Sequence, residues 1–116
     1  SRPNGVDLPE EEWRHGLHGG AIETAMMLHL RPDLVRREAL QTFPSLGQEL
    51  EGTLACLRPE GQPSFAWLAG DLNPLGATGD ATLATADIGA RLASHYGQVL
   101  ADVVQDARQF PINRLI

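Results

Sequence analysis

Apolar residues recur at helical spacing in the last third of the chain. They stand three to five positions apart from Leu83 to Val103, which predicts a long amphipathic helix. Asp80 precedes this run and is expected to cap the helix with its carboxylate. Residues 108–111 end the helix, because Pro111 cannot continue it. We expect this helix to hold the chain against its neighbours.

A second helical pattern follows a pair of glycines. Four apolar residues share one stripe of this pattern: Ile22, Met26, Met27 and Leu30. The pair Gly19 and Gly20, which tolerates backbone angles closed to other residues, therefore opens a helix over residues 21–30. Arg31 and Pro32 mark its end, and Pro32 can start a further short helix that runs to about residue 40.

The middle of the chain predicts a β-hairpin. Residues 52–57 and 64–69 have the composition of short strands, and the turn-forming residues 58–63 join them. Cys56 is expected to be a buried residue of the first strand. One hairpin does not make a stable sheet face alone, so we expect further strands from another subunit or from upstream residues.

Helices plus a short hairpin define the fold class as α/β. Residues 1–14 form an irregular lead-in, with room for a helical turn at the acidic run 10–12. The 116 residues suffice for one domain and no more.

Composition and charge exclude several classes of function. A net charge of −6 argues against nucleic acid, because binding phosphates needs a cationic face. No apolar stretch is long enough to span a bilayer, so we expect no membrane partner, and no signal-peptide pattern is present. A single cysteine cannot form an internal disulfide, which favours the reducing cytoplasm. The first residue is serine rather than methionine, as expected of a processed, tagged or truncated product.

The most informative segment begins at His18. It has the sequence HGGAIETAMML, and RPDLV follows at residues 31–35. This segment resembles the signature of the creatininase family, H-(A/G)-G-x-x-E-T-(S/A)-x-M-L followed by P-(D/E)-L-V. A second stretch, residues 71–89, resembles the family run that leads into the last helix. The resemblance spans the chain from Trp13 to about Val104.

The resemblance implies a metal-dependent amidohydrolase that cleaves a C–N bond in a small cyclic or linear amide. Family members use one or two divalent metals, commonly zinc, manganese or iron. They have a three-layer α/β/α sandwich fold, and hexamers are common. This chain would be the C-terminal half of such a domain. Its expected partners are the amide substrate and either further copies of itself or a complementing N-terminal portion.

The same resemblance assigns roles to the residues of the motif. His18 would be the catalytic proton shuttle, just before a helix N-terminus that favours an oxyanion. Gly19 and Gly20 would let the substrate come close. Glu23 is a candidate catalytic-site residue: it either complements the helix dipole or orients the amides of the loop. Thr24 is expected to make a hydroxyl contact at the helix start.

Two departures separate this chain from creatininase itself. Leu17 stands where creatininase has an acidic residue, and Arg14 and His15 stand where it has a Trp–Asp pair. Another amide substrate therefore fits better than creatinine. The family's metal ligands all lie upstream of the motif, so we expect no metal ligand and no bound cofactor in this chain alone. His15 and His18 without a carboxylate make a weak metal signal.

Two other interpretations stay open. The chain could be a non-catalytic interaction or assembly module that keeps the fold without the metal site. It could also be a stand-alone enzyme with a new metal site at His15 and His18. Asp71 and Asp80 could form a catalytic pair, but residues of this kind more often cap turns and helices.

Overall fold

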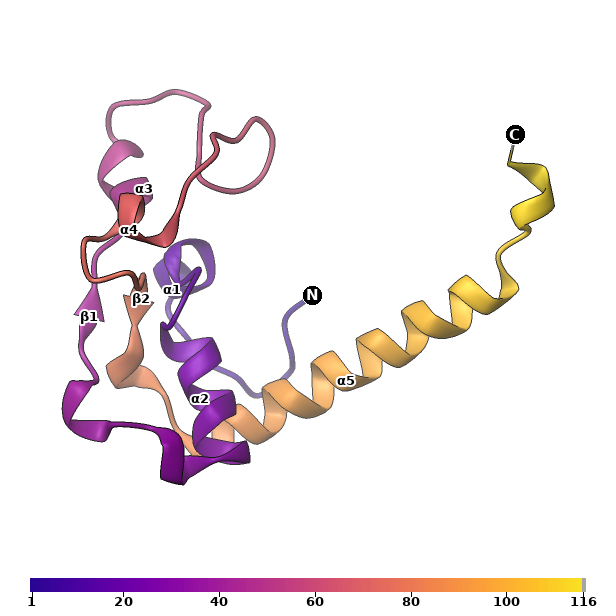
Figure 1. Cartoon of the computed structure of the whole chain (residues 1–116), viewed down its shortest axis with the longest axis horizontal. Helices are drawn as coiled ribbons and strands as arrows, with labels where there is room; N and C mark the ends of the chain where they lie inside the picture. The colour runs from indigo at the N-terminus through magenta and orange to yellow at the C-terminus, as the bar shows by residue number, and fades with distance from the viewer. Residues whose placement is uncertain (116) are drawn as a thin grey trace.

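The computed structural model describes residues 1–115 as short helices around a very small sheet, with one long helix leading away (Figure 1). The α-helices are α1 (Glu10–His15), α2 (Ala21–Leu30), α3 (Leu46–Leu50), α4 (Ala69–Leu72) and α5 (Ala86–Gln109). The strands are β1 (Thr42–Phe43) and β2 (Gly79–Asp80), and the 3₁₀ turns are η1 (Pro32–Leu34), η2 (Arg37–Ala39), η3 (Ala81–Leu83) and η4 (Ile112–Arg114). The acidic run of the lead-in begins α1. The short helix predicted from Pro32 to about residue 40 does not form, and two separate 3₁₀ turns, η1 and η2, stand in its place.

The sheet joins two segments that are far apart in the sequence. β1 and β2 pair antiparallel, with Thr42 opposite Asp80 and Phe43 opposite Gly79. An isolated antiparallel bridge between His18 and Thr78 continues this pairing toward α2. Helices with a small antiparallel sheet are consistent with the predicted α/β class.

The main helix packing is between α2 and the first part of α5. The helix predicted at residues 21–30 forms, but its buried residues are Ala21, Ala25 and Leu28 rather than the apolar stripe. Two of its four members are exposed on the surface, Met27 by 39% and Leu30 by 60%. The reason is the close crossing of α2 and α5 at Gly89 of α5. A Cβ on this residue would lie 1.8 Å from the carbonyl oxygen of Ala25. The helices approach so closely at this point that Gly89 lies against the backbone of Ala25.

The start of α5 differs from the prediction and its end matches it. Thr85 caps α5 by accepting a hydrogen bond from the Ile88 amide at 3.2 Å. Asp80 instead caps the preceding turn η3, where its carboxylate accepts from the Thr82 amide at 3.0 Å. The helix ends at Gln109, just before Phe110 and Pro111.

The predicted hairpin does not form. Residues 51–68 contain no strand, only an isolated parallel bridge between Arg58 and Ser64. Cys56 is exposed, contrary to the prediction. A lone two-stranded hairpin is marginal in water, and residues 52–57 are mostly exposed, so no buried face favours the pairing. Side chains hold the loop instead: Trp67 Nε1 donates to the Pro59 carbonyl at 2.8 Å.

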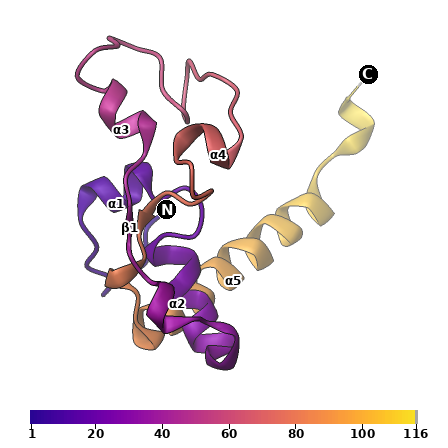
Figure 2. The same cartoon turned by 60° about the vertical axis from the view of Figure 1, so that its left-hand side comes forward.

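The core is small and the molecule is extended. The buried hydrophobic residues are Leu8, Ala21, Ala25, Leu28, Leu72, Ala81 and Leu92. The radius of gyration is 16.7 Å, against about 13 Å for a compact domain of this length. The difference reflects α5, which leaves the body in both Figure 1 and the turned view of Figure 2. None of the helices within residues 1–115 is long and apolar enough to cross a membrane.

Candidate active site

His18 lies on the loop between α1 and α2, and its backbone is anchored at two points. Its carbonyl accepts the Thr78 amide at 2.7 Å, and the Leu17 amide donates to Thr78 Oγ1 at 3.1 Å. Thr78 itself is fully buried. The His18 side chain is 58% exposed. A fixed backbone therefore carries a side chain that remains accessible.

Glu23 contacts both His18 and the loop that carries it. Its Oε2 accepts the Gly19 amide at 2.5 Å and lies 3.4 Å from His18 Nδ1. Of the two predicted roles for Glu23, orienting a loop amide is the one that this contact matches. Thr24 Oγ1 makes the expected contact at the helix start by donating to the Gly19 carbonyl at 3.4 Å.

The two glycines of the motif shape the loop in different ways. Gly19 has φ +68°, a left-handed conformation that favours glycine. Gly20 is buried, and a Cβ there would lie 2.5 Å from Oε1 of Glu12. Gly20 therefore faces a packed interior, whereas its predicted contact with substrate stays a prediction.

Sequence reasoning missed Glu12, which ties the loop together. This carboxylate is only 4% exposed. Its Oε1 accepts the Ala21 amide and its Oε2 accepts the Asp80 amide, each at 2.7 Å. It joins the N-terminus of α2, where negative charge is stabilised, to strand β2. Gly16 and Gly79 also crowd it, since a Cβ on either would lie within 2.3 Å and 2.7 Å of Oε1, respectively.

In the sequence, Glu12 looks like the third member of a solvated acidic run. The available signal is the set of glycines at 16, 20 and 79, because close packing against a carboxylate requires residues without side chains. That signal can be recognised only once the fold brings Glu12 next to Gly79 and Asp80, which are 67 and 68 positions away in the sequence.

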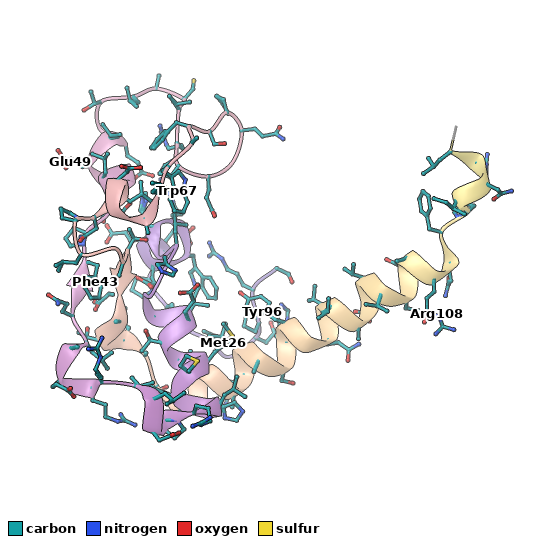
Figure 3. All side chains as sticks on the ribbon, in the orientation of Figure 1. Met26, Phe43, Glu49, Trp67, Tyr96 and Arg108 are labelled. Atoms are coloured by element: carbon teal, nitrogen blue, oxygen red, sulfur yellow. The ribbon has the colours of Figure 1, made fainter. Side chains whose placement is uncertain are left out.

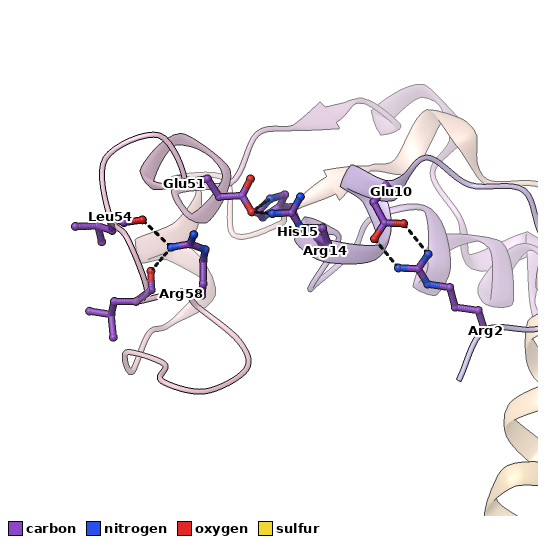
Figure 4. Close-up of polar contacts among 8 residues, drawn as sticks. Arg2, Glu10, Arg14, His15, Glu51, Leu54 and Arg58 are labelled. Atoms are coloured by element: carbon purple, nitrogen blue, oxygen red, sulfur yellow. Dashed lines mark hydrogen bonds and ion pairs between the residues drawn. The ribbon is translucent and has the colours of Figure 1, made fainter.

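His15 is buried next to the ion pair of Arg14 and Glu51 (Figure 4). Its Nε2 lies 3.2 Å from Glu51 Oε1 but without the geometry of a hydrogen bond, and its Nδ1 has no partner among the described residues. Burial is the main cause that lowers the pKa of His15, and the positive charges of Arg14 and Arg58 lower it further, against the opposing effect of Glu11. His15 is therefore a neutral packed residue near neutral pH, away from the exposed His18.

A cleft of about 740 Å³ lies between α1, the sheet, α3 and α4, and His18 is not among its lining residues. Asp71 and Asp80 line it, together with Glu49. Both aspartates act as caps: Asp71 accepts the Leu68 amide at 2.8 Å, and Asp80 caps η3 rather than the long helix. The exposed His18 therefore lies outside this cleft.

The described part of the chain offers no metal centre. Residues 1–115 contain no group of three or more His, Cys, Asp or Glu side chains that could hold a metal ion. His15 and His18 have different carboxylate neighbours, Glu51 and Glu23 respectively. They do not converge on one position.

A match to a family of amidohydrolases covers residues 2–104. That family is creatininase, described as creatinine amidohydrolase, and the chain belongs to it. The resemblance seen at His18 and in residues 71–89 is therefore confirmed. No match emerges among curated proteins or among solved structures. The family as a whole is generally metal-dependent.

Proposed function

We propose that this chain is the C-terminal half of a metal-dependent amidohydrolase and that His18 is its proton-transfer residue. The observation that carries the proposal is the position of His18. It lies in the family motif, exposed, on a loop held rigid by Glu12 and Thr78. Such a residue can reach a substrate while its backbone stays fixed.

Glu23 would fix the proton arrangement on His18. A carboxylate 3.4 Å from Nδ1 favours the tautomer with the proton on that nitrogen. Nε2 is then the nitrogen that accepts a proton from the attacking water. As the C–N bond breaks, the same nitrogen returns the proton to the departing amine. Glu23 positions His18 in this account and does not touch the reacting atoms.

The residues present do not fit the metal that the family uses. No group among residues 1–115 could hold it, so no step of the reaction is assigned to it here. We propose that zinc, manganese or iron is held by residues upstream of the His18 motif, in a complete three-layer sandwich. The complete protein would act on a small cyclic or linear amide in the cytoplasm, as a homo-oligomer.

Replacing His18 tests this function. In the protein as its native host produces it, His18→Ala is expected to lower turnover of a panel of small cyclic and linear amides by at least about a hundredfold, the usual contribution of general acid–base catalysis. His29→Ala is the matched control, because His29 is an exposed histidine of α2 outside the loop. Near-normal turnover by His18→Ala would disprove the assigned role.

A second function, an assembly module, is favoured by one observation. Many large apolar side chains are exposed, and those of α5 lie together along one helix. An assembly module predicts a folded oligomer that hydrolyses no amide and binds no metal, which separates it from the enzyme half.

A further inference from the structure

The loop that carries His18 joins α1 to α2 within the body of the molecule, well away from the outer part of α5 around Arg108 (Figure 3). Thr78, which comes just before strand β2, contacts this loop through an isolated bridge to His18. Thr78 and Leu92 are the largest fully buried side chains among the described residues. An interior side chain therefore lies directly behind the loop of an exposed histidine.

A buried hydroxyl is unfavourable unless it forms a hydrogen bond, because it loses its contacts with water. A valine would fill nearly the same space at position 78 without that cost. Within residues 1–115, the Thr78 hydroxyl makes one hydrogen bond, in which Oγ1 accepts the Leu17 amide at 3.1 Å. The polar group of this interior residue thus acts on the loop, one residue before His18.

Thr78 holds the peptide groups on both sides of the Leu17–His18 pair. The Leu17 amide donates to Oγ1, and the His18 carbonyl accepts the Thr78 amide at 2.7 Å. Because each peptide group is planar, fixing both groups restrains the backbone from which the His18 side chain projects. Any residue other than proline could supply the amide at position 78, but only a side chain with an acceptor can hold Leu17.

The loop lies directly against the segment that contains Thr78. A Cβ added to Gly20 would lie 2.9 Å from the Thr78 carbonyl oxygen, and one added to Gly19 would lie 3.3 Å from Cβ of Ala77. No other side chain separates the loop from residues 77 and 78 at these points. A change at Thr78 therefore acts on the loop without an intermediary.

We infer that the Thr78 hydroxyl is a positioning group for the reaction, because it holds the loop so that His18 meets the substrate in one orientation. The inference rests on the proposed role of His18 in proton transfer. Thr78 is fully buried and does not touch the reacting atoms. A misplacement of about 1 Å in a catalytic group can lower the rate about a hundredfold, so loss of the hydroxyl should affect kcat more than KM.

Two variants at position 78 separate positioning from packing. Thr78→Val keeps the volume but loses the acceptor, and it is expected to lower kcat about tenfold to a hundredfold with KM nearly unchanged. Thr78→Ser keeps the acceptor but loses a methyl group, and it is expected to retain most of the original kcat. A side chain that only packed would give the opposite order. Thr53→Val makes the same replacement at an exposed threonine and is expected to leave kcat unchanged.

Turnover is measured on the protein as its native host produces it, with the amide panel used for His18→Ala. Hydrogen exchange of the Leu17 amide is a second readout that does not depend on turnover. The exchange is expected to be slow in the original protein and in Thr78→Ser, and at least about tenfold faster in Thr78→Val.

Normal kcat and slow Leu17 exchange in Thr78→Val would overturn the inference. A tenfold loss of kcat in Thr78→Ser would overturn it as well, and this test remains available if Thr78→Val does not fold. A His18→Ala protein that keeps its turnover would instead refute the proposed function, so the two failures are distinguishable.

Discussion

Removal of the Glu12 carboxylate is expected to be among the most damaging single changes in this chain. Glu12→Ala leaves the amides of Ala21 and Asp80 without their acceptor, although both donate to the carboxylate at 2.7 Å in the intact protein. A stranded buried donor costs about 1–3 kcal/mol; the Ala21 amide is buried, whereas the Asp80 amide is half-buried and should cost about 1 kcal/mol. The expected loss in the free energy of unfolding is therefore about 2–4 kcal/mol, a large part of the roughly 5–15 kcal/mol typical of a domain.

Two companion variants sharpen this prediction. Glu12→Gln keeps the size and one acceptor oxygen but turns an amide nitrogen toward the other backbone donor, so about half of the loss is expected. Glu11→Ala removes an exposed carboxylate from the same helix, and its effect should stay within about 0.5 kcal/mol. Urea unfolding followed by circular dichroism at one pH measures all three. A Glu12→Ala protein within about 1 kcal/mol of the original refutes the reasoning.

The remaining predictions concern the helix crossing and one buried histidine. Gly89→Ala places a Cβ 1.8 Å from the Ala25 carbonyl and should destabilise the chain by about 1–3 kcal/mol or more. Gly97→Ala, where a Cβ meets open space, should stabilise α5 by up to about 1 kcal/mol; equal thermal shifts for the two variants would contradict the close crossing. Since burial lowers the pKa of His15, the unfolded chain takes up this proton first as the solution is acidified. The contribution of His15 to the free energy of unfolding is therefore full above about pH 6.5. It falls as the pH drops from there toward the lower pKa that His15 has in the folded protein. A pH series of unfolding free energies measures this slope, which His15→Phe should remove; the same slope in both proteins would show that His15 is not its source.

The parts of the fold predicted correctly from sequence are those fixed by local chemistry. The glycine pair and Pro32 bound α2 at the predicted residues, and Pro111 follows the end of α5. The buried face of α2 was not predictable from apolar spacing, because the close approach at Gly89 is a tertiary contact. The hairpin was wrong because two short strands alone are marginally stable without a further strand or a helix packed against them.

The candidate site also contains some residues that the sequence identified and others that it did not. The motif marks His18 and Glu23 by their order along the chain, and the structure brings the two side chains together. Glu12 and Thr78 support them through backbone contacts, and such contacts leave no residue pattern that a single sequence reveals. The link from Glu12 to Asp80 spans 68 positions.

The intact mass of the protein isolated from its native host tests the central claim most directly. If this chain is the C-terminal half of a creatininase-family enzyme, the mass should be about twice 12.5 kDa, with the additional residues preceding Ser1 and supplying the metal ligands. A mass of 12.5 kDa would contradict the enzyme-half account and would favour the assembly module.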